Sequence, residues 1–258
     1  MTKPHLRHAD LKQDLVNHYY EFRGFRKFGV IAAFSGRHYK MNFTETGPRT
    51  VVIAQRKHFC EQAGIDFNKL VCLEQVHGSN IIRVGESEAG RGARDPESAL
   101  PHSDAVITNQ SGIVLSVRTA DCAPVFFLDK KRRAIGMAHI GWRGAAAKLS
   151  AKMIQAFRVQ FLSKPEDLLI AIGPMIRSCC YEVGDEFLPE FKTFVKRRKK
   201  KLYFDLTRQI VDNLISEGIA ETQVVDCRIC TVCENKKFSS YRKEGAQFRT
   251  MMSVMSLI

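Results

Sequence analysis

The sequence has no apolar run close to the roughly 20 residues that a membrane-spanning helix needs. Its first 20 residues also lack the apolar core of a signal peptide. We therefore expect a cytoplasmic protein with no membrane partner. No linker rich in Gly, Pro or Ser and no internal repeat divides the 258 residues. We expect one domain over residues 29–258, after a loose and partly helical lead-in over residues 1–28.

Several enzyme motifs are missing as well. The sequence contains neither the phosphate loop G-x-x-x-x-G-K-[ST] nor the dinucleotide fingerprint G-x-G-x-x-G. It has no H-E-x-x-H, no G-x-S-x-G, and no zinc-deaminase pattern of H-x-E with P-C-x-x-C. Its eight histidines form no His-x-His pair, which argues against a multicopper oxidase. The chemistry of this chain has to come from another arrangement of residues.

Eight cysteines are present, but disulfides are rare in large chains without an export signal. Cys179 and Cys180 are adjacent, and a bridge between them would be strained. We expect no structural disulfide. The spacing of Cys227, Cys230 and Cys233 suits three ligands of a zinc or iron–sulfur site, or a redox pair. Because no fourth cysteine with suitable spacing lies nearby, we favour unligated thiols there.

Positive charge is in excess, with a formal net charge of +13. Such an excess can bind phosphate backbones without sequence-specific contacts. Six of the positive charges stand together at residues 196–201, between an expected helix and an expected strand. A block of like charges is usually a solvated, mobile loop, so we favour that interpretation. Nucleic acid is the less expected partner.

The apolar pattern predicts strands and helices that do not strictly alternate. Strands are expected at 28–34, 70–75, 80–84, 103–107, 113–117, 134–138, 168–172 and 224–227, and helices at 50–64, 185–196 and 206–217. Residues 248–258 form an apolar tail. This order favours an α+β fold, in which a mixed sheet carries helices on its outer faces.

Residues 111–144 contain two apolar runs that end in chemically capable groups. The run 113–117 leads to Cys122, and the run 134–138 leads to His139. A turn at 129–131 would join them as a hairpin and bring Cys122 close to His139. A helical period follows Gly144, so residues 139–144 are expected at a strand-to-helix junction, where backbone N–H groups can bind anions.

His77, Cys122 and His139 each follow an apolar strand, where a turn begins. One Cys and two His can hold zinc and leave a fourth position open, which is typical of a catalytic site. The long intervals match no local zinc motif. The alternative is a Cys122 thiolate nucleophile activated by His139.

A set of short segments resembles one known family. The segments are EQVHG at 74–78, TADCAPV at 119–125, HIGWRG at 139–144, IGP at 172–174, YEVG at 181–184 and FSSYR at 238–242. Together they resemble the bacterial polyphenol oxidoreductase or laccase-domain family. This family is also called the peptidoglycan editing factor family, and it is associated with purine nucleoside phosphorylase and adenosine deaminase activity.

The resemblance implies a four-layer α/β/β/α sandwich with mixed sheets. It also implies that His77, Cys122 and His139 are zinc ligands, with copper less expected. Purine nucleosides and phosphate are the implied partners. The family's basic positions near the pocket match Arg37 and Arg56.

Other matches to the family are partial. Arg242 and Arg249 match its final elements in part, and Asn42 stands where the family has an Asn after a longer loop. Because the loop after Arg37 is shorter than in the family, the resemblance does not fix the substrate specificity.

The implied chemistry has two parts. Zinc with an open position can activate water for attack at C6 of adenine. Phosphorolysis also needs positive charge to hold phosphate beside C1′ of the ribose, for which Arg37, Arg56 and Arg143 are candidates. Asp121 is expected either to orient a ligand, to accept a proton or to cap a turn. Substrate contacts are expected from Asn42, Arg242 and these three arginines. The alternative functions are a copper-dependent polyphenol oxidase and a cell-wall quality-control factor.

Overall fold

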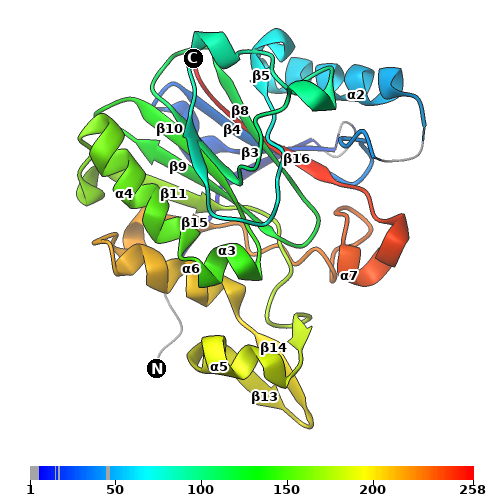
Figure 1. Ribbon diagram of the computed structural model, residues 1–258, viewed down its shortest axis with the longest axis vertical. Helices are drawn as coiled ribbons and strands as arrows, with labels where there is room; N and C mark the ends of the chain where they lie inside the picture. Colours follow the sequence, from blue (N-terminus) through cyan, green and yellow to red (C-terminus); the bar gives the residue numbers. More distant parts are fainter. Residues whose placement is uncertain (1–5, 15, 17, 45–46) are drawn as a thin grey trace.

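Two large sheets form the centre of the computed structural model (Figure 1), which describes residues 6–14, 16, 18–44 and 47–258. The first is seven-stranded and mixed, in the order β1-β15-β11-β9-β10-β7-β6. Its strands are β1 (Arg7–His8), β6 (Ile81–Arg83), β7 (Ala105–Thr108), β9 (Ala123–Asp129), β10 (Ala134–Ile140), β11 (Leu168–Ile172) and β15 (Val224–Asp226).

The second sheet has six strands in the order β2-β3-β4-β16-β8-β5. Its strands are β2 (Leu11–Asp14), β3 (Tyr19–Phe22), β4 (Val30–Ser35), β5 (Leu70–Val71), β8 (Val114–Thr119) and β16 (Met251–Leu257). Only β5 and β8 pair in parallel; the other neighbours are antiparallel.

Helices cover the outer face of each sheet. α4 (Leu149–Phe161) and α6 (Leu206–Ile215) pack on the seven-stranded sheet, and α2 (Arg49–Ala63) packs on the six-stranded sheet. The other helices are short, namely α1 (Arg23–Arg26), α3 (Trp142–Ala146), α5 (Leu188–Phe191) and α7 (Tyr241–Glu244). Figure 1 shows α4 and α6 on one side of the molecule and α2 on the opposite side. Among the described residues, no helix is long and apolar enough to cross a membrane.

Three apolar clusters separate the four layers. One joins the seven-stranded sheet to α4 and α6, through residues such as Phe127 and Phe157. A second lies between the two sheets and contains Phe126 and Phe34. The third joins the six-stranded sheet to α2 and contains Phe59. Alternate residues of β9 thus face opposite layers, as a strand buried on both faces requires. The predicted four-layer α/β/β/α sandwich is confirmed.

A small three-stranded sheet projects from the main body (Figure 1). It consists of β12 (Glu182–Val183), β13 (Val195–Arg198) and β14 (Lys201–Phe204). The basic residues 196–201 are exposed as expected, but they lie on a β-hairpin and not in a loop. The predicted helix 185–196 is also wrong in part, because α5 spans one turn between two short 3-10 segments.

Other expectations can be compared with these bounds. The helix predicted at 50–64 is α2, which stops at Gly64 in the left-handed conformation. The helix predicted at 206–217 is α6 and the strand predicted at 168–172 is β11. The lead-in is partly helical as expected, because it contains α1, but it is not loosely attached, because β1 and β3 pair within the two sheets. The domain boundary at residue 29 stays a prediction.

The predicted hairpin has a different first strand. β10 pairs with β9, and the run 113–117 belongs to β8 in the other sheet. Cys122 immediately precedes β9, and His139 lies opposite Pro124 in the β9–β10 register. The correct hairpin therefore still brings Cys122 close to His139.

Candidate metal centre and its cavity

His77, Cys122 and His139 converge from three separate parts of the chain. His77 lies in the loop between β5 and β6, Cys122 precedes β9, and His139 is within β10. One ligand atom from each lies within 4.8 Å of the other two. The Cys122 sulfur is 4.0 Å from Nδ1 of His77, and the two imidazole rings are 4.7 Å apart between centroids. The structure thus brings together the three residues expected to bind a metal.

Asp104, which sequence reasoning missed as a site residue, positions both histidines. Its Oδ1 accepts a hydrogen bond from Nδ1 of His139 at 2.7 Å and from the backbone N–H of His77 at 3.0 Å. Its Oδ2 accepts the N–H of Gly78 at 2.6 Å and that of Val76 at 3.2 Å. A carboxylate that takes Nδ1–H of a histidine leaves Nε2 available as a ligand. The only signal in the sequence is an acidic residue directly before a buried strand.

Gly141 allows the ligands to approach one another. A Cβ atom at this position would lie 2.8 Å from the Cys122 sulfur and 3.5 Å from Nδ1 of His77. The first distance is too short for any real Cβ contact. Glycine as the third residue of the H-I-G-W segment therefore keeps open the space in which the three ligand atoms meet.

The charged forms of Cys122, His139 and Asp104 stabilise one another. Burial would raise the pKa of Cys122, but the positive charge of His139 and hydrogen bonds from both histidines lower it to about 6. Burial would lower the pKa of His139, but Cys122 and Asp104 raise it to about 9. Burial also opposes ionisation of Asp104, yet hydrogen bonds from His139 and Gly78 hold its pKa below the ordinary value. The protein alone therefore holds a thiolate beside a charged imidazole.

The donor set fits a divalent transition metal. Two imidazoles and a thiolate are ligands for zinc, and three protein ligands leave a fourth position facing the cavity. The same donors occur in blue-copper sites, which add a weak axial Met ligand. The part of the cavity wall that the structure describes contains no methionine. Gln75, which can also serve as a weak axial copper ligand, does line the cavity, so the donor set fits either metal.

A cavity of about 510 Å³ opens above the three ligands. Its volume is within the range of sites for small organic ligands. Aromatic and cationic side chains dominate its wall, namely Trp142, Tyr181, Tyr241, Phe248, Arg118, Arg143 and Arg242. Asn42 also lines it. The expected substrate contacts Asn42, Arg143 and Arg242 thus lie at the cavity, together with Arg118, which sequence reasoning missed.

Arg37 and Arg56 are placed elsewhere, and neither belongs to the described cavity wall. Arg56 is fully buried and donates to the carbonyl oxygens of Met41, Gly92 and Ala93. Arg37 forms an ion pair with Glu244 at 3.1 Å. In this structure both side chains therefore hold neighbouring segments and do not line the cavity, and direct substrate contacts by these two arginines stay a prediction.

Asp121 has a left-handed backbone, with φ at +87°. Its Oδ1 accepts a hydrogen bond from the Thr231 hydroxyl at 2.5 Å, and its Oδ2 accepts the N–H of Arg242 at 2.7 Å. Its side chain is thus committed to two segments that flank the cavity. This placement favours the turn-holding role over the proton-accepting role expected as an alternative.

The junction after β10 also differs from expectation. The helix begins at Trp142, before Gly144, and stops after five residues, where Lys148 adopts the left-handed conformation before α4. So short a helix has little dipole to offer an anion. Positive charge at the cavity comes from arginine side chains, of which Arg143 lies 4.2 Å above the Trp142 ring.

The fold and the site together define an α/β/β/α protein with a His₂Cys centre in a ligand-sized cavity. The chain belongs to the family described as multi-copper polyphenol oxidoreductase laccase, whose sequence model matches residues 26–258. This finding confirms the resemblance drawn from the short motifs.

Similar proteins include nucleoside enzymes. Purine nucleoside phosphorylase YlmD of Geobacillus stearothermophilus is 32% identical over 214 residues, covering 80% of this chain and 78% of the relative. Adenosine deaminase RL5, from an unknown prokaryotic organism, is 28% identical over 211 residues, covering 75% of this chain and 77% of the relative. The crystal structure of hypothetical protein YfiH from Bacillus licheniformis has a TM-score of 0.91 and 25% identity, covering 96% of this chain and 99% of that one.

Proposed function

We propose that this protein is a zinc-dependent purine nucleoside phosphorylase that also deaminates adenosine. It would convert adenosine, inosine or guanosine and phosphate to the free base and ribose 1-phosphate, in the cytoplasm. One observation carries the proposal: the three ligands of the His₂Cys centre face the same cavity as three arginine side chains. The names of the two relatives described above supply the substrate class.

Zinc would be held by His77, Cys122 and His139, where it would supply a Lewis acid beside the bound nucleoside. Asp104 keeps the His139 ring in one orientation through the 2.7 Å hydrogen bond to Nδ1. The same carboxylate fixes the loop that carries His77 through three backbone N–H groups. A single buried carboxylate thereby fixes the positions of two of the three ligands.

Phosphate would be held by Arg118, Arg143 and Arg242. Guanidinium groups bind phosphate oxygens through paired hydrogen bonds, and arginine stays charged at every physiological pH. Arg143 and Arg242 are further restrained, because each lies over an aromatic ring. In phosphorolysis, a phosphate oxygen forms a bond to C1′ as the C1′–N9 bond breaks, and the purine leaves with a proton on nitrogen.

The purine would contact the aromatic wall. Trp142, Tyr241 and Phe248 offer flat apolar surfaces suited to stacking. Tyr181 lines the same cavity, and burial followed by the nearby Cys122 thiolate raises its pKa, so its hydroxyl stays protonated at neutral pH. It can therefore donate a hydrogen bond to the base. In deamination, water would attack C6 of adenine and the amino group would leave as ammonia.

A multicopper polyphenol oxidase fits the site less well. Such enzymes need several histidine-rich copper sites. Within the described part of the chain, the groups able to hold a metal are the His₂Cys centre and one group made of cysteines alone. No observation of the site favours electron transfer from a phenol, and we propose no oxidase activity.

The test is phosphate-dependent release of hypoxanthine from inosine. We expect activity in the zinc-loaded wild type and its loss in Cys122→Ala, with zinc content measured in parallel. Cys60→Ala serves as a matched control, because Cys60 is also a free thiol but lies on the buried face of α2, away from the cavity. Equal rates in wild type and Cys122→Ala, or no release from either, would refute the proposal.

A further inference from the structure

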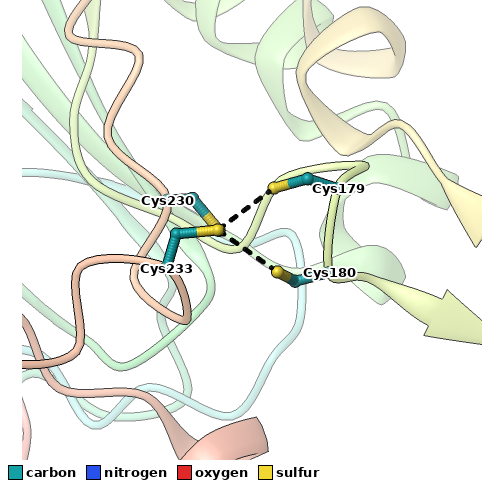
Figure 2. Close-up of side chains that lie close together, drawn as sticks. All are labelled: Cys179, Cys180, Cys230 and Cys233. Carbon is teal, nitrogen blue, oxygen red and sulfur yellow. Dashed lines mark hydrogen bonds between the residues drawn. The ribbon is translucent and has the colours of Figure 1, made fainter.

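A second group of possible metal ligands lies outside the His₂Cys centre. It consists of Cys179, Cys180, Cys230 and Cys233, whose sulfur atoms all lie within 4.8 Å of one another. Figure 2 shows the side chains of two loops pointing toward a common centre. Cys179 and Cys180 follow β11, and Cys230 and Cys233 follow β15. The expectation that Cys230 and Cys233 lack further cysteine partners is wrong, because the partners come from residues about 50 positions earlier. Cys227 does not belong to the group.

The distances between sulfur atoms suit a tetrahedral metal. A zinc ion bound to four thiolates at about 2.3 Å places neighbouring sulfurs about 3.8 Å apart, because they occupy the corners of a tetrahedron. The Cys233 sulfur lies 3.7 Å from that of Cys179 and 3.5 Å from that of Cys180. A disulfide needs about 2.05 Å, and the four cysteines are free thiols. A cubane iron–sulfur cluster would hold its cysteines farther apart, since inorganic sulfide and iron lie between them.

The backbone around the cluster is also organised. Cys230 and Cys233 have the C-x-x-C spacing common in zinc sites, and they stand on a turn in which the N–H of Glu234 donates to the carbonyl of Cys230 at 2.9 Å. On the other loop, the N–H groups of Cys180 and Tyr181 both donate to the carbonyl of Arg177 at 2.8 Å. Both loops thus hold their sulfurs in fixed directions.

We propose that Cys179, Cys180, Cys230 and Cys233 form a structural zinc site of Cys₄ type. Four protein ligands close the coordination sphere, so this zinc has no open position for a substrate. The site is separate from the His₂Cys centre, shares no ligand with it, and does not depend on the proposed nucleoside chemistry.

The position of the cluster indicates what this zinc does. The loop that carries Cys179 and Cys180 also carries Ile176 and Tyr181, which line the cavity. The loop that carries Cys230 and Cys233 also carries Thr231, whose hydroxyl holds Asp121 beside the Cys122 ligand. A metal bound between the loops would cross-link one wall of the cavity to the support of the other centre.

The test uses metal analysis of the full chain, purified without chelators. We expect the zinc content of Cys122→Ala and of the double variant Cys230→Ser/Cys233→Ser each to be half that of the wild type. Cys227→Ser is the matched control, because Cys227 is a free thiol of the same segment, and it should keep the full zinc content. Zinc X-ray absorption on Cys122→Ala should show four sulfur ligands at about 2.3 Å.

X-ray absorption on Cys122→Ala leaves the four-cysteine group intact, so it tests the proposal even where the double variant fails to fold. Nitrogen or oxygen ligands around the zinc of Cys122→Ala would overturn the proposal. So would the absence of zinc from Cys122→Ala purified without chelators, a disulfide within the group, or iron with acid-labile sulfide. Loss of nucleoside activity alone decides nothing about this site, because its readouts are zinc content and ligand identity.

Discussion

Nδ1 of His139 is 2.7 Å from Oδ1 of Asp104, and both side chains are almost completely buried. The pairing of β10 with β7 places them side by side, since the N–H of His139 also donates to the Asp104 carbonyl at 2.7 Å. A buried anion that accepts hydrogen bonds from both histidine segments is the main support of the His₂Cys centre. This relationship leads to the first of four predictions.

Asp104→Asn should weaken zinc binding at the His₂Cys centre by about 10- to 100-fold. The amide retains the shape of the carboxylate but turns an N–H₂ group toward backbone N–H donors of residues 76–78. One or more of those donors then loses its acceptor, and the His77 loop shifts. Competition with a chromophoric chelator measures the affinity. Asp185→Asn, at an exposed carboxyl group, should leave it unchanged; equal affinities in both variants would contradict the role assigned to Asp104.

Gly141→Ala should disturb the ligands directly. Its new Cβ would lie 2.8 Å from the Cys122 sulfur, so the sulfur must move. A displacement of about 1 Å at a reacting site lowers kcat/KM about 100-fold. The measurements are zinc content and kcat/KM for inosine phosphorolysis. Gly144→Ala is the matched control, because its Cβ would meet no atom closer than 3.5 Å. Comparable losses in both variants would show that the effect is not specific to the ligand contact.

Arg56→Met should destabilise the fold rather than weaken substrate binding at the cavity. The substitution removes every donor that satisfies the carbonyls of Met41, Gly92 and Ala93, and three orphaned acceptors in a buried site cost about 3 kcal/mol or more. Urea denaturation measures the loss. Lys57→Met, at the neighbouring exposed position, should change the free energy of unfolding little. A stable Arg56→Met protein with a raised KM would support the expected substrate contact.

In metal-free protein, Cys122 should react rapidly with iodoacetamide at neutral pH. Its pKa of about 6 makes it a thiolate there, so the reaction should slow as pH falls below about 6. His139→Gln removes the neighbouring positive charge and should slow alkylation at pH 7 about tenfold or more. Peptide mapping separates Cys122 from the other thiols. Saturation with zinc should suppress the reaction; an unchanged rate with zinc bound would mean that Cys122 is not a ligand.

The sequence predicts correctly those helices and strands whose apolar pattern is contained within one short segment. The helix α2 and the strand β11 are examples, and both have clear stop signals in Gly64 and Gly173. The pairing of strands is harder to predict, because it joins residues that are far apart in the sequence. The sequence pattern pairs β8 with β10, whereas β10 pairs with β9, and the turn that carries Cys122 leads from β8 into β9.

The metal ligands could be inferred from motifs, but their support could not. Asp104 is separated from His139 by 35 positions, and no spacing rule connects an acidic residue in a loop to a histidine within a strand. The four-cysteine group was missed for the same reason, since its halves lie on loops after two different strands of one sheet. Arg56 was assigned to the cavity by family position alone, and only burial revealed its structural role.

The place of β16 within its sheet has a consequence for biosynthesis. This strand pairs with β4 on one side and β8 on the other, so residues 251–257 complete a sheet whose other strands are translated much earlier. Until the ribosome has released those residues, β4 and β8 expose unpaired edges and the apolar surfaces that later close against the seven-stranded sheet. Before residues 251–257 are translated, these edges and apolar surfaces can pair with other chains, so the nascent chain is open to aggregation at that stage.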